Sequence, residues 1–329
     1  MRLVTFEHDR VARLGALIDG DATVVDLDRA HGMATKRHDP RLASMLALIE
    51  GGDEALVLAR QTLAFADGRR PPGAVLPATE VRLLAPLPRP TQLRDGLFFE
   101  KHLQQAFAAS RRLKARRDPA AAGQPPKEGG SFAIPPIWYE RPLYYKSNRM
   151  SVIGPGADIH WPAYAELLDY ELEFACVIGR PTKDAHRDHA RSAIFGYTIF
   201  NDVSARDTQV IEMPGMLGPT KCKDFDTGNV LGPCLVTADE IPDPYNLTMT
   251  ARVNGQEWSR GSSATMHWKF EDAIATITQS ETLYPGEVIG SGTVGDGCGL
   301  EQDRFLKPGD IVELEVEKIG VLRNRIVKP

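Results

Sequence analysis

Residues 168–179 read LDYELEFACVIG, and this stretch constrains the fold more than any other. Its apolar run at 174–178 is typical of a strand that is buried on both faces. Alternation along a strand points Glu171 and Glu173 to one side, and Asp169 to that side as well. Neighbouring carboxylates repel each other at the mouth of a buried strand, and a hard cation would relieve that repulsion. The alternative interpretation is an exposed strand edge with solvated acids.

Short strand-like runs recur through the rest of the C-terminal part of the chain. They lie at 170–178, 194–200, 231–236, 247–253, 287–291 and 311–317. Helices are expected at 97–117 and 268–279, and the segment 118–130 after the first of them is predicted to be a loop. The helix and the loop together, residues 97–130, are predicted to act as a lid. Many short strands with few helices favour a closed or rolled mixed sheet over a doubly wound fold.

The first part of the chain has a different pattern. Residues 2–27 form short alternating runs broken by turn residues, which predicts a small antiparallel unit. Two short helices are expected near 40–50 and 53–66. Proline is dense between 71 and 90, as in a linker. We therefore predict a small N-terminal β/α domain at 1–88 and a larger, β-rich domain at 89–329, which makes the whole chain mixed α+β.

Composition excludes several classes of protein. The 329 residues include 39 basic and 44 acidic side chains, so the net charge of −5 argues against a nucleic-acid partner. No segment approaches the roughly 20 apolar residues of a membrane span. The first ten residues, MRLVTFEHDR, lack the apolar stretch of a signal peptide. The four cysteines have no paired spacing, as in reduced thiols. These features predict a cytoplasmic protein without a membrane partner.

Two further segments carry candidate functional residues. The sequence IFNDVSARDTQ, 199–209, places Asp202 at the end of an apolar strand. The sequence LRDGLFFEKHLQQ, 93–105, places Asp95 before the long helix and His102 two turns into it. Both aspartates also suit a helix cap, and a single helical histidine is often structural. Each segment alone therefore leaves a structural and a functional interpretation open.

Together these segments resemble the fumarylacetoacetate hydrolase family over roughly residues 85–325. The family's Glu-x-Glu strand is matched at 168–179. The other motifs follow in the family's order: Asn-Asp-x-Ser-Ala-Arg-Asp-x-Gln at 201–209, Lys-x-Phe at 223–225, a Gly-Pro strand at 231–234, a Leu-x-Pro-Gly element at 283–293 and a Pro-Gly-Asp-x-Val-Glu segment at 308–313. The resemblance implies a mixed β-sandwich roll, and a homodimer. Asp95 and the extra N-terminal domain resemble the longer, two-domain branch.

The resemblance also implies a site and a reaction. The implied ligands of a divalent cation, Mg²⁺ or Ca²⁺ with Mn²⁺ possible, are Asp95, Glu171, Glu173 and Asp202. The implied catalytic residues are His102, Glu301, Arg206, Gln209 and Lys223. Tyr145, with Lys146 as the alternative, and Thr293 are the candidates for holding substrate, and ordinary sheet or surface packing is the other interpretation of Tyr145 and Lys146. The expected reaction is hydrolysis of a C–C bond in a 1,3-diketo acid of the fumarylacetoacetate or acylpyruvate type. The cation steadies the enolate, and a His–Glu pair activates water.

Two alternatives to hydrolysis remain open at this stage. The same chemistry supports a metal-dependent lyase, decarboxylase or isomerase that acts on a 2-oxo acid. A non-enzymatic binding protein would be expected to lack a ligand or the base, and none is missing from the sequence.

One departure from the family pattern bears on the substrate: Met213 or Pro214 stands where the family places a tyrosine. Fumarylacetoacetate itself is therefore not assured as the substrate.

Overall fold

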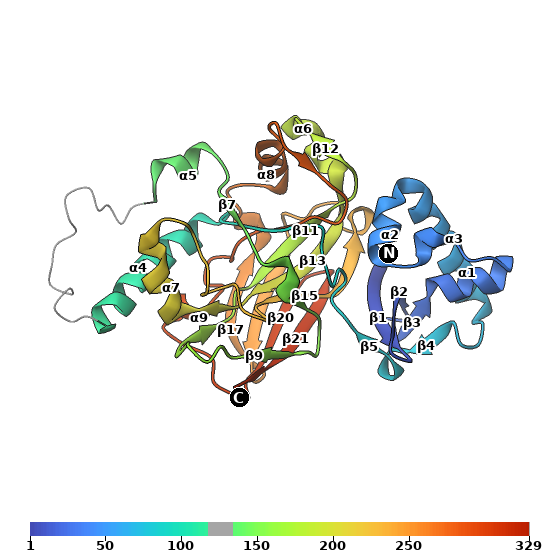
Figure 1. The fold of residues 1–329 in the computed structure, drawn as a ribbon, viewed down its shortest axis with the longest axis horizontal. Coiled ribbons are helices and arrows are strands. Elements are labelled where there is room, and N and C mark those ends of the chain that lie inside the picture. The colour runs from blue at the N-terminus through green and yellow to red at the C-terminus, as the bar shows by residue number, and fades with distance from the viewer. Residues whose placement is uncertain (118–133, 329) are drawn as a thin grey trace.

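The computed structural model describes residues 1–117 and 134–328 (Figure 1). The predicted loop at 118–130, and with it part of the predicted lid at 97–130, lies outside the described residues. Within the described part of the chain, no helix has the length and apolar character needed to cross a membrane. The four cysteines are free and buried.

A large mixed sheet dominates the fold. Twelve of the described strands belong to it, ten of them in the order β4-β3-β2-β1-β15-β13-β11-β19-β6-β7, with β5 on β1 and β8 on β15. Their bounds are β1 Arg2–His8, β2 Val11–Ile18, β3 Thr23–Asp26, β4 Val75–Pro77, β5 Arg82–Leu83, β6 Leu93–Gly96, β7 Tyr144–Lys146, β8 Val152–Ile153, β11 Glu173–Ile178, β13 Ile194–Asp202, β15 Asn229–Thr237 and β19 Val288–Gly290.

A second sheet closes the roll. Its order is β17-β16-β20-β21-β9, with β9 Asp158–His160, β16 Thr248–Val253, β17 Gln256–Ser262, β20 Ile311–Val316 and β21 Gly320–Val327. Two short pairs join β10 Leu168–Asp169 to β14 Ser204–Ala205, and β12 Thr182–Lys183 to β18 Thr282–Leu283. The main core lies between the sheets, where Phe174 and Ile199 of the first share an apolar cluster with Leu314 and Leu322 of the second. The predicted β-rich α+β class is confirmed.

The four predicted helical segments each correspond to a described helix, whereas several other described helices, all short, were not predicted. The described helices are α1 Leu27–Thr35, α2 Met45–Glu50, α3 Gly52–Arg69, α4 Glu100–Arg117, α5 Pro136–Glu140, α6 Arg187–Ala190, α7 Arg206–Glu212, α8 Phe270–Ile277 and α9 Gly299–Gln302. Short 3₁₀ turns are η1 Pro40–Leu42, η2 Ala78–Glu80, η3 Arg149–Ser151, η4 Arg191–Ala193, η5 Met213–Gly215, η6 Ala238–Glu240 and η7 Ser263–Thr265. The sequence did not predict α1. Its start is fixed by Asp26, whose side chain accepts a hydrogen bond from the Arg29 backbone N–H.

The N-terminal strands extend the large sheet instead of forming a separate one. Strand β1 pairs antiparallel with β15, with Arg2 opposite Val236. Helices α1, α2 and α3 gather at this end of the molecule (Figure 1). A second apolar cluster contains Leu48 of α2 and Val177 of β11, so it spans both predicted domains. The boundary near residue 88 stays a prediction.

The opposite end of the roll gathers the segments that carry the candidate residues. Strand β6 pairs parallel with β19 next to β11. Helix α4 follows β6 after a short connection and contacts both α7 and α9. Figure 1 shows these three helices together at the end of the sheets away from the N-terminus. Segments far apart in sequence therefore meet at one end of the fold.

Candidate active site

A cavity of about 510 Å³ opens between α4, α7 and the ends of the central strands. Its lining combines an acidic inner end with an apolar outer part. The predicted site residues that line it are Asp95, His102, Tyr145, Glu171, Glu173, Arg206, Gln209, Thr293 and Lys223. Glu301 lies behind His102, and Asp202 lies behind Tyr145 and Lys223. The structure thus brings most of the predicted residues to one place.

Three carboxylates meet at the inner end of the cavity. Asp95, Glu171 and Glu173 each place an oxygen within 4.8 Å of the others, and all are buried. Oxygens bound about 2.1–2.4 Å from one ion are at most about 4.2–4.8 Å apart, so this spacing suits a shared cation. Gly290 makes the approach of Asp95 possible, because a Cβ at that glycine would lie 2.4 Å from Asp95 Oδ1.

The charge environment differs between the two glutamates of this cluster. Burial opposes ionisation of Glu171, but the charges of Lys223 and Arg206 outweigh it and hold the pKa of Glu171 at about 2. Burial and the charges of Asp95 and Glu171 raise the pKa of Glu173 well above its usual range. Burial, together with the charge of Asp202, raises the pKa of Asp95 to about 8. Without a cation, the Asp95–Glu173 side therefore favours protonated carboxyls.

Two buried carboxylate oxygens have no hydrogen-bond partner among the described residues. They are Glu173 Oε2 and Asp202 Oδ1. The other oxygen of Asp202 accepts hydrogen bonds from the Tyr145 hydroxyl and, over 2.7 Å, from Lys223 Nζ. Buried acceptors without partners carry a free-energy cost that a bound cation would remove. The donor set, all carboxylate oxygen, fits a hard divalent ion such as Mg²⁺, Mn²⁺ or Ca²⁺.

Two buried cations border the acidic cluster. Lys223 Nζ lies 2.6 Å from Glu171 Oε2, and Arg206 Nη1 lies 2.8 Å from Glu171 Oε1. Arg206 Nη1 also donates to Gln209 Oε1 over 3.0 Å. Arg206 Nη2 is buried and has no partner in the described part of the chain. Within the described residues, this leaves an N–H donor without a partner on a residue that lines the cavity.

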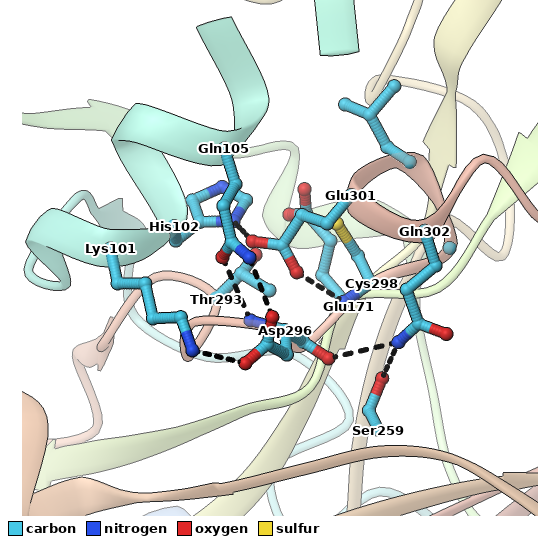
Figure 2. Close-up of polar contacts among 12 residues, drawn as sticks. Lys101, His102, Gln105, Glu171, Ser259, Thr293, Asp296, Cys298, Glu301 and Gln302 are labelled. Atoms are coloured by element: carbon cyan, nitrogen blue, oxygen red, sulfur yellow. Dashed lines mark hydrogen bonds and ion pairs between the residues drawn. The ribbon is translucent and has the colours of Figure 1, made fainter. Parts of the chain in front are cut away.

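His102 and Glu301 form a buried pair on the other wall. The His102 Nδ1 and Glu301 Oε1 atoms lie 2.8 Å apart (Figure 2). Glu301 Oε2 accepts the backbone N–H of Cys298 over 3.1 Å, so both carboxylate oxygens are held. Burial raises the pKa of the Cys298 thiol well above its usual range, which keeps the thiol neutral. A carboxylate on Nδ1 leaves Nε2 of a cavity-lining histidine free to exchange protons.

Asp169 has a role that the sequence did not reveal. Its carboxylate accepts the backbone N–H groups of Gly299 and Leu300 over 2.8 and 2.9 Å, and Arg206 Nε over 2.8 Å. It therefore ties the start of α9, which carries Glu301, to the arginine that borders Glu171. Alternation suggested a place on the metal-facing side, but these contacts turn Asp169 toward α9. No local signal in LDYEL distinguishes the two roles, because α9 lies far along the chain.

The predicted substrate-holding residues divide into two groups. Tyr145 lines the cavity and donates to Asp202, and Thr293 Oγ1 donates to Glu173 Oε1 over 3.3 Å. Lys146 is exposed and does not line the cavity, so its prediction as a substrate residue is wrong in this structure. The reason is strand alternation: Tyr145 and Lys146 are neighbours in β7 and point to opposite faces.

The capping interpretations of the two aspartates do not hold. Asp95 lies inside β6, whereas α4 begins only at Glu100. Asp202 ends β13, and the residue before α7 is Ala205, without a side-chain cap. The sequence also missed the outer wall of the cavity, to which Ala106, Phe107, Trp138, Val210 and Met213 contribute. Scattered apolar residues on separate helices carry no local sequence signal of this kind.

Comparison with known proteins agrees with this geometry. The family described as fumarylacetoacetate (FAA) hydrolase C-terminal matches residues 116–327. This chain belongs to the fumarylacetoacetate hydrolase family. It is 34% identical over 334 residues to human "Oxaloacetate tautomerase FAHD2A, mitochondrial", covering 99% of this chain and 92% of that protein. It is 30% identical to "Oxaloacetate tautomerase YisK" of Bacillus subtilis, covering 99% and 100%.

Solved structures give the same assignment of the fold. The fumarylacetoacetate hydrolase of Exiguobacterium antarcticum superposes with a TM-score of 0.70 at 25% identity, with 100% of both chains covered. The described β-rich roll is therefore the fold of this family. The relatives include proteins named as tautomerases and as hydrolases, which matches the two classes of reaction that the sequence left open.

Proposed function

We propose that this protein is a divalent-cation-dependent enzyme that interconverts the keto and enol forms of a 2-oxo acid. The observation that carries the proposal is a buried His102–Glu301 pair on the same cavity as carboxylates whose buried oxygens lack partners. The names of the relatives at 34% and 30% identity support oxaloacetate as a first substrate to test. This ranks tautomerisation above the hydrolysis expected from sequence.

The cation is assigned to the acidic inner end of the cavity. Asp95, Glu171 and Glu173 would hold it, with Asp202 as a fourth ligand through its partnerless oxygen. When bound, a divalent cation polarises a carbonyl and stabilises the negative charge of an enolate oxygen. The choice among Mg²⁺, Mn²⁺ and Ca²⁺ is left to metal titration.

His102 is the proposed proton carrier. Its Nε2 takes a proton from the carbon next to the substrate carbonyl, and Glu301 on Nδ1 fixes the tautomer and stabilises the imidazolium. The same proton then returns to the oxygen of the substrate, so the reaction needs no water and no other reactant. The free N–H of Arg206 is placed to bind a substrate carboxylate or the developing oxyanion.

Hydrolysis of a 1,3-diketo acid of the fumarylacetoacetate or acylpyruvate type is the second candidate. The observation that favours it is the complete hydrogen bonding of Glu301, which holds His102 as firmly as a water-activating base requires. In that reaction His102 would deprotonate water, hydroxide would attack one carbonyl, and the C–C bond would break to give two acids. Both candidates form an enolate, but they differ in the bond that breaks: a C–H bond of the intact substrate in tautomerisation, and a C–C bond after the addition of water in hydrolysis.

Product analysis separates the two candidates. Purified enzyme with Mg²⁺ or Mn²⁺ is given oxaloacetate, acetylpyruvate and fumarylacetoacetate in separate assays. Faster keto–enol equilibration of oxaloacetate, followed by ultraviolet absorbance and NMR, supports tautomerisation. Formation of two acids from a diketo substrate supports hydrolysis, and CO₂ release from oxaloacetate would point to a decarboxylase. Unchanged equilibration with intact diketo acids would remove both candidates.

His102→Ala is the matched control for catalysis. We expect turnover to fall about 100- to 10,000-fold while the cation remains bound, because the histidine contributes proton transfer and is not a ligand. Calorimetric metal titration checks that the cation still binds to the His102→Ala variant. Full activity in His102→Ala would overturn the assignment of the base.

The remaining expectations concern the surroundings of the enzyme. We propose a homodimer and a two-domain organisation divided near residue 88, as the family resemblance implies. Light scattering of the purified protein tests the first, and expression of residues 89–329 tests the second. The compartment predicted from sequence is the cytoplasm, whereas the human relative carries the word mitochondrial in its name. Localisation in the source cell decides between them.

A further inference from the structure

The outer part of the cavity is an apolar slot that the proposed chemistry does not use. Beyond the acidic cluster, the wall on α4 consists of Leu103, Ala106, Phe107 and Ser110. At helical spacing these residues and His102 share one face of α4, and Lys114 lies at its far end. The rise of a helix places Lys114 about 18 Å from His102 along the axis. The slot therefore leads from the reacting centre to the surface.

The opposite walls of the slot are also apolar. Val210, Met213 and Pro214 line it from α7 and η5, and Leu97, Leu143 and Trp138 line it from the β6–α4 and α5–β7 segments. Trp138 is fully buried, and its Nε1 donates to the Leu97 carbonyl over 2.6 Å. This hydrogen bond fixes the ring and satisfies its polar atom, so an ordered apolar side chain packs behind Leu103 and Phe107 of the slot wall.

A small diacid such as oxaloacetate does not account for this slot. Its two carboxylates would be satisfied at the inner end, beside Arg206 and the cation, and would leave the outer part empty. A carboxylate placed against Phe107 and Met213 would lose hydration without gaining a partner. Cavities of several hundred Å³ with apolar walls and a few polar groups at one end are typical of larger ligands with one polar head.

We infer that the substrate is a 2-oxo acid that carries an extended apolar arm, and that the α4 slot binds this arm. The inference rests on the proposed function, because it places the 2-oxo acid head at the cation and His102. It adds the chemical class of the substituent, which neither the family motifs nor the names of the relatives supply. Oxaloacetate then occupies the head position alone.

A binding series tests the slot without relying on turnover. The probes are oxamate and its N-alkyl derivatives from N-ethyl to N-octyl, which keep a 2-oxo acid head and lengthen only the arm. Calorimetric titration into the Mg²⁺-loaded full-length enzyme gives each Kd. We expect affinity to rise up to about fourfold for each methylene buried, and to level off once the chain leaves the slot.

Two substitutions at different depths in the slot test how long an alkyl chain it can hold. Ala106→Phe fills the slot near the reacting centre, and Ser110→Phe fills it one helical turn farther out. We expect both to leave oxamate affinity unchanged and to end the gain from chain length, with Ala106→Phe ending it at a shorter chain. Gln104→Phe is the matched control, because Gln104 is exposed on the same helix and does not line the cavity.

The outcomes distinguish the slot from the proposed function. Oxamate binding with less than about twofold change across the alkyl series would overturn the slot and leave the proposed function intact. Oxamate binding without turnover of any 2-oxo acid, but with the chain-length gain, would support the slot and remove the proposed reaction. Failure of every probe to bind would remove both. If Ala106→Phe does not fold, as judged by its melting curve, Ser110→Phe alone decides.

Discussion

Two neighbouring residues of β6, Arg94 and Asp95, carry buried charges to opposite faces of one strand. Arg94 is 2% exposed and pairs with the buried Glu287 and with Glu281. Asp95 is 3% exposed and faces other carboxylates instead of a cation of its own. The first charge is neutralised by the chain itself, whereas the second is not. A buried ionisable group with a charge partner in the chain maintains the fold, and one without a cationic partner marks a place for a ligand.

The largest effect should come from neutralising a carboxylate on the Asp95 side. We expect Glu173→Gln to lower turnover at least about 1,000-fold, because the cation contributes several kcal/mol to transition-state stabilisation. The stability of the metal-free protein should stay the same or rise, since the pKa of Glu173 is raised well above its usual range and little charge is lost. Activity assays measure the turnover, metal titration measures the accompanying loss of metal affinity, and denaturant unfolding measures the stability.

Glu287→Gln is the matched control for this substitution, on the Arg94 side. It makes the same chemical change in a buried glutamate that pairs with Arg94. We expect metal affinity to be unchanged and stability to fall, which is the reverse of Glu173→Gln. Equal metal affinities in Glu173→Gln and Glu287→Gln would show that the Asp95 side of β6 is not the cation site.

The next largest effect should be a loss of folding stability when the buried ion pair of Arg94 is removed. Arg94→Ala leaves Glu287 buried without its partner, so the free energy of unfolding should fall by about 3–5 kcal/mol. Arg82→Ala removes an exposed pair with Glu7 and should cost less than about 1 kcal/mol. Urea unfolding of the metal-free proteins gives both values. A loss for Arg94→Ala no larger than that for Arg82→Ala would contradict a structural role for this pair.

The comparison also indicates what the sequence could predict. Glu171 and Glu173 could be assigned from a short segment with a family motif, and Asp95 from the resemblance to the longer branch of the family. The partners of Arg94 were not, since Glu281 and Glu287 lie almost two hundred residues away and have no shared pattern with LRDG. Strands with strong alternation were placed within a few residues. Helix α1 was missed because its sequence LDRAHGMAT is short and follows directly on β3, with no break between the two elements.

The candidate site shows the same limit. Glu301 was assigned through the resemblance, and the structure places it on His102. Lys146 was misassigned because neighbouring residues in a strand face opposite ways, and the sequence did not set the register of β7. The outer wall depends on how α4, α5 and α7 pack together, which is tertiary information. Motifs locate the chemistry, whereas the shape that selects a substrate comes from packing.

A smaller effect on turnover should follow from weakening the contacts by which Asp169 joins the start of α9 to Arg206. Asp169→Asn removes a charge from a carboxylate that accepts Gly299 N–H, Leu300 N–H and Arg206 Nε. We expect a 10- to 100-fold loss in kcat, as for residues that orient a catalytic group, with KM nearly unchanged. Because Glu301 would no longer be held against His102, the pH–rate profile should also shift, which a loss of stability alone would not cause.

Asp207→Asn is the control for that variant. Asp207 lies in α7 next to Arg206 and accepts the backbone N–H groups of Glu166 and Leu167, and neither of these hydrogen bonds among the described residues reaches α9. Its kcat and pH–rate profile should match those of the unmodified enzyme. Asp169 would be only a structural residue if its variant lost stability but kept the original pH–rate profile.

The smallest expected effect is a pH dependence of stability in the metal-free protein. The pKa of Asp95 is raised to about 8, so the folded protein holds a proton that the unfolded chain releases above about pH 4. Stability should therefore fall as the pH rises from about 5 to about 8, by at least about 1 kcal/mol, or roughly 2–4 °C in Tm. Glu171, with a pKa of about 2, acts in the opposite direction but only at lower pH.

Thermal scans in chelator across this pH range measure the effect, with Asp95→Asn as the matched variant. That substitution removes the titrating group, so the slope of Tm against pH should become flatter, and the variant should be the more stable protein near pH 8. Saturating Mg²⁺ should reverse the slope in the unmodified enzyme, because a cation binds the deprotonated carboxylates. An Arg94→Ala protein should keep the original slope despite its lower Tm, since Arg94 faces away from the cluster. If Asp95→Asn and Arg94→Ala changed the slope equally, the two faces of β6 would not be electrostatically independent, and the division between structural and ligand-binding charges would fail.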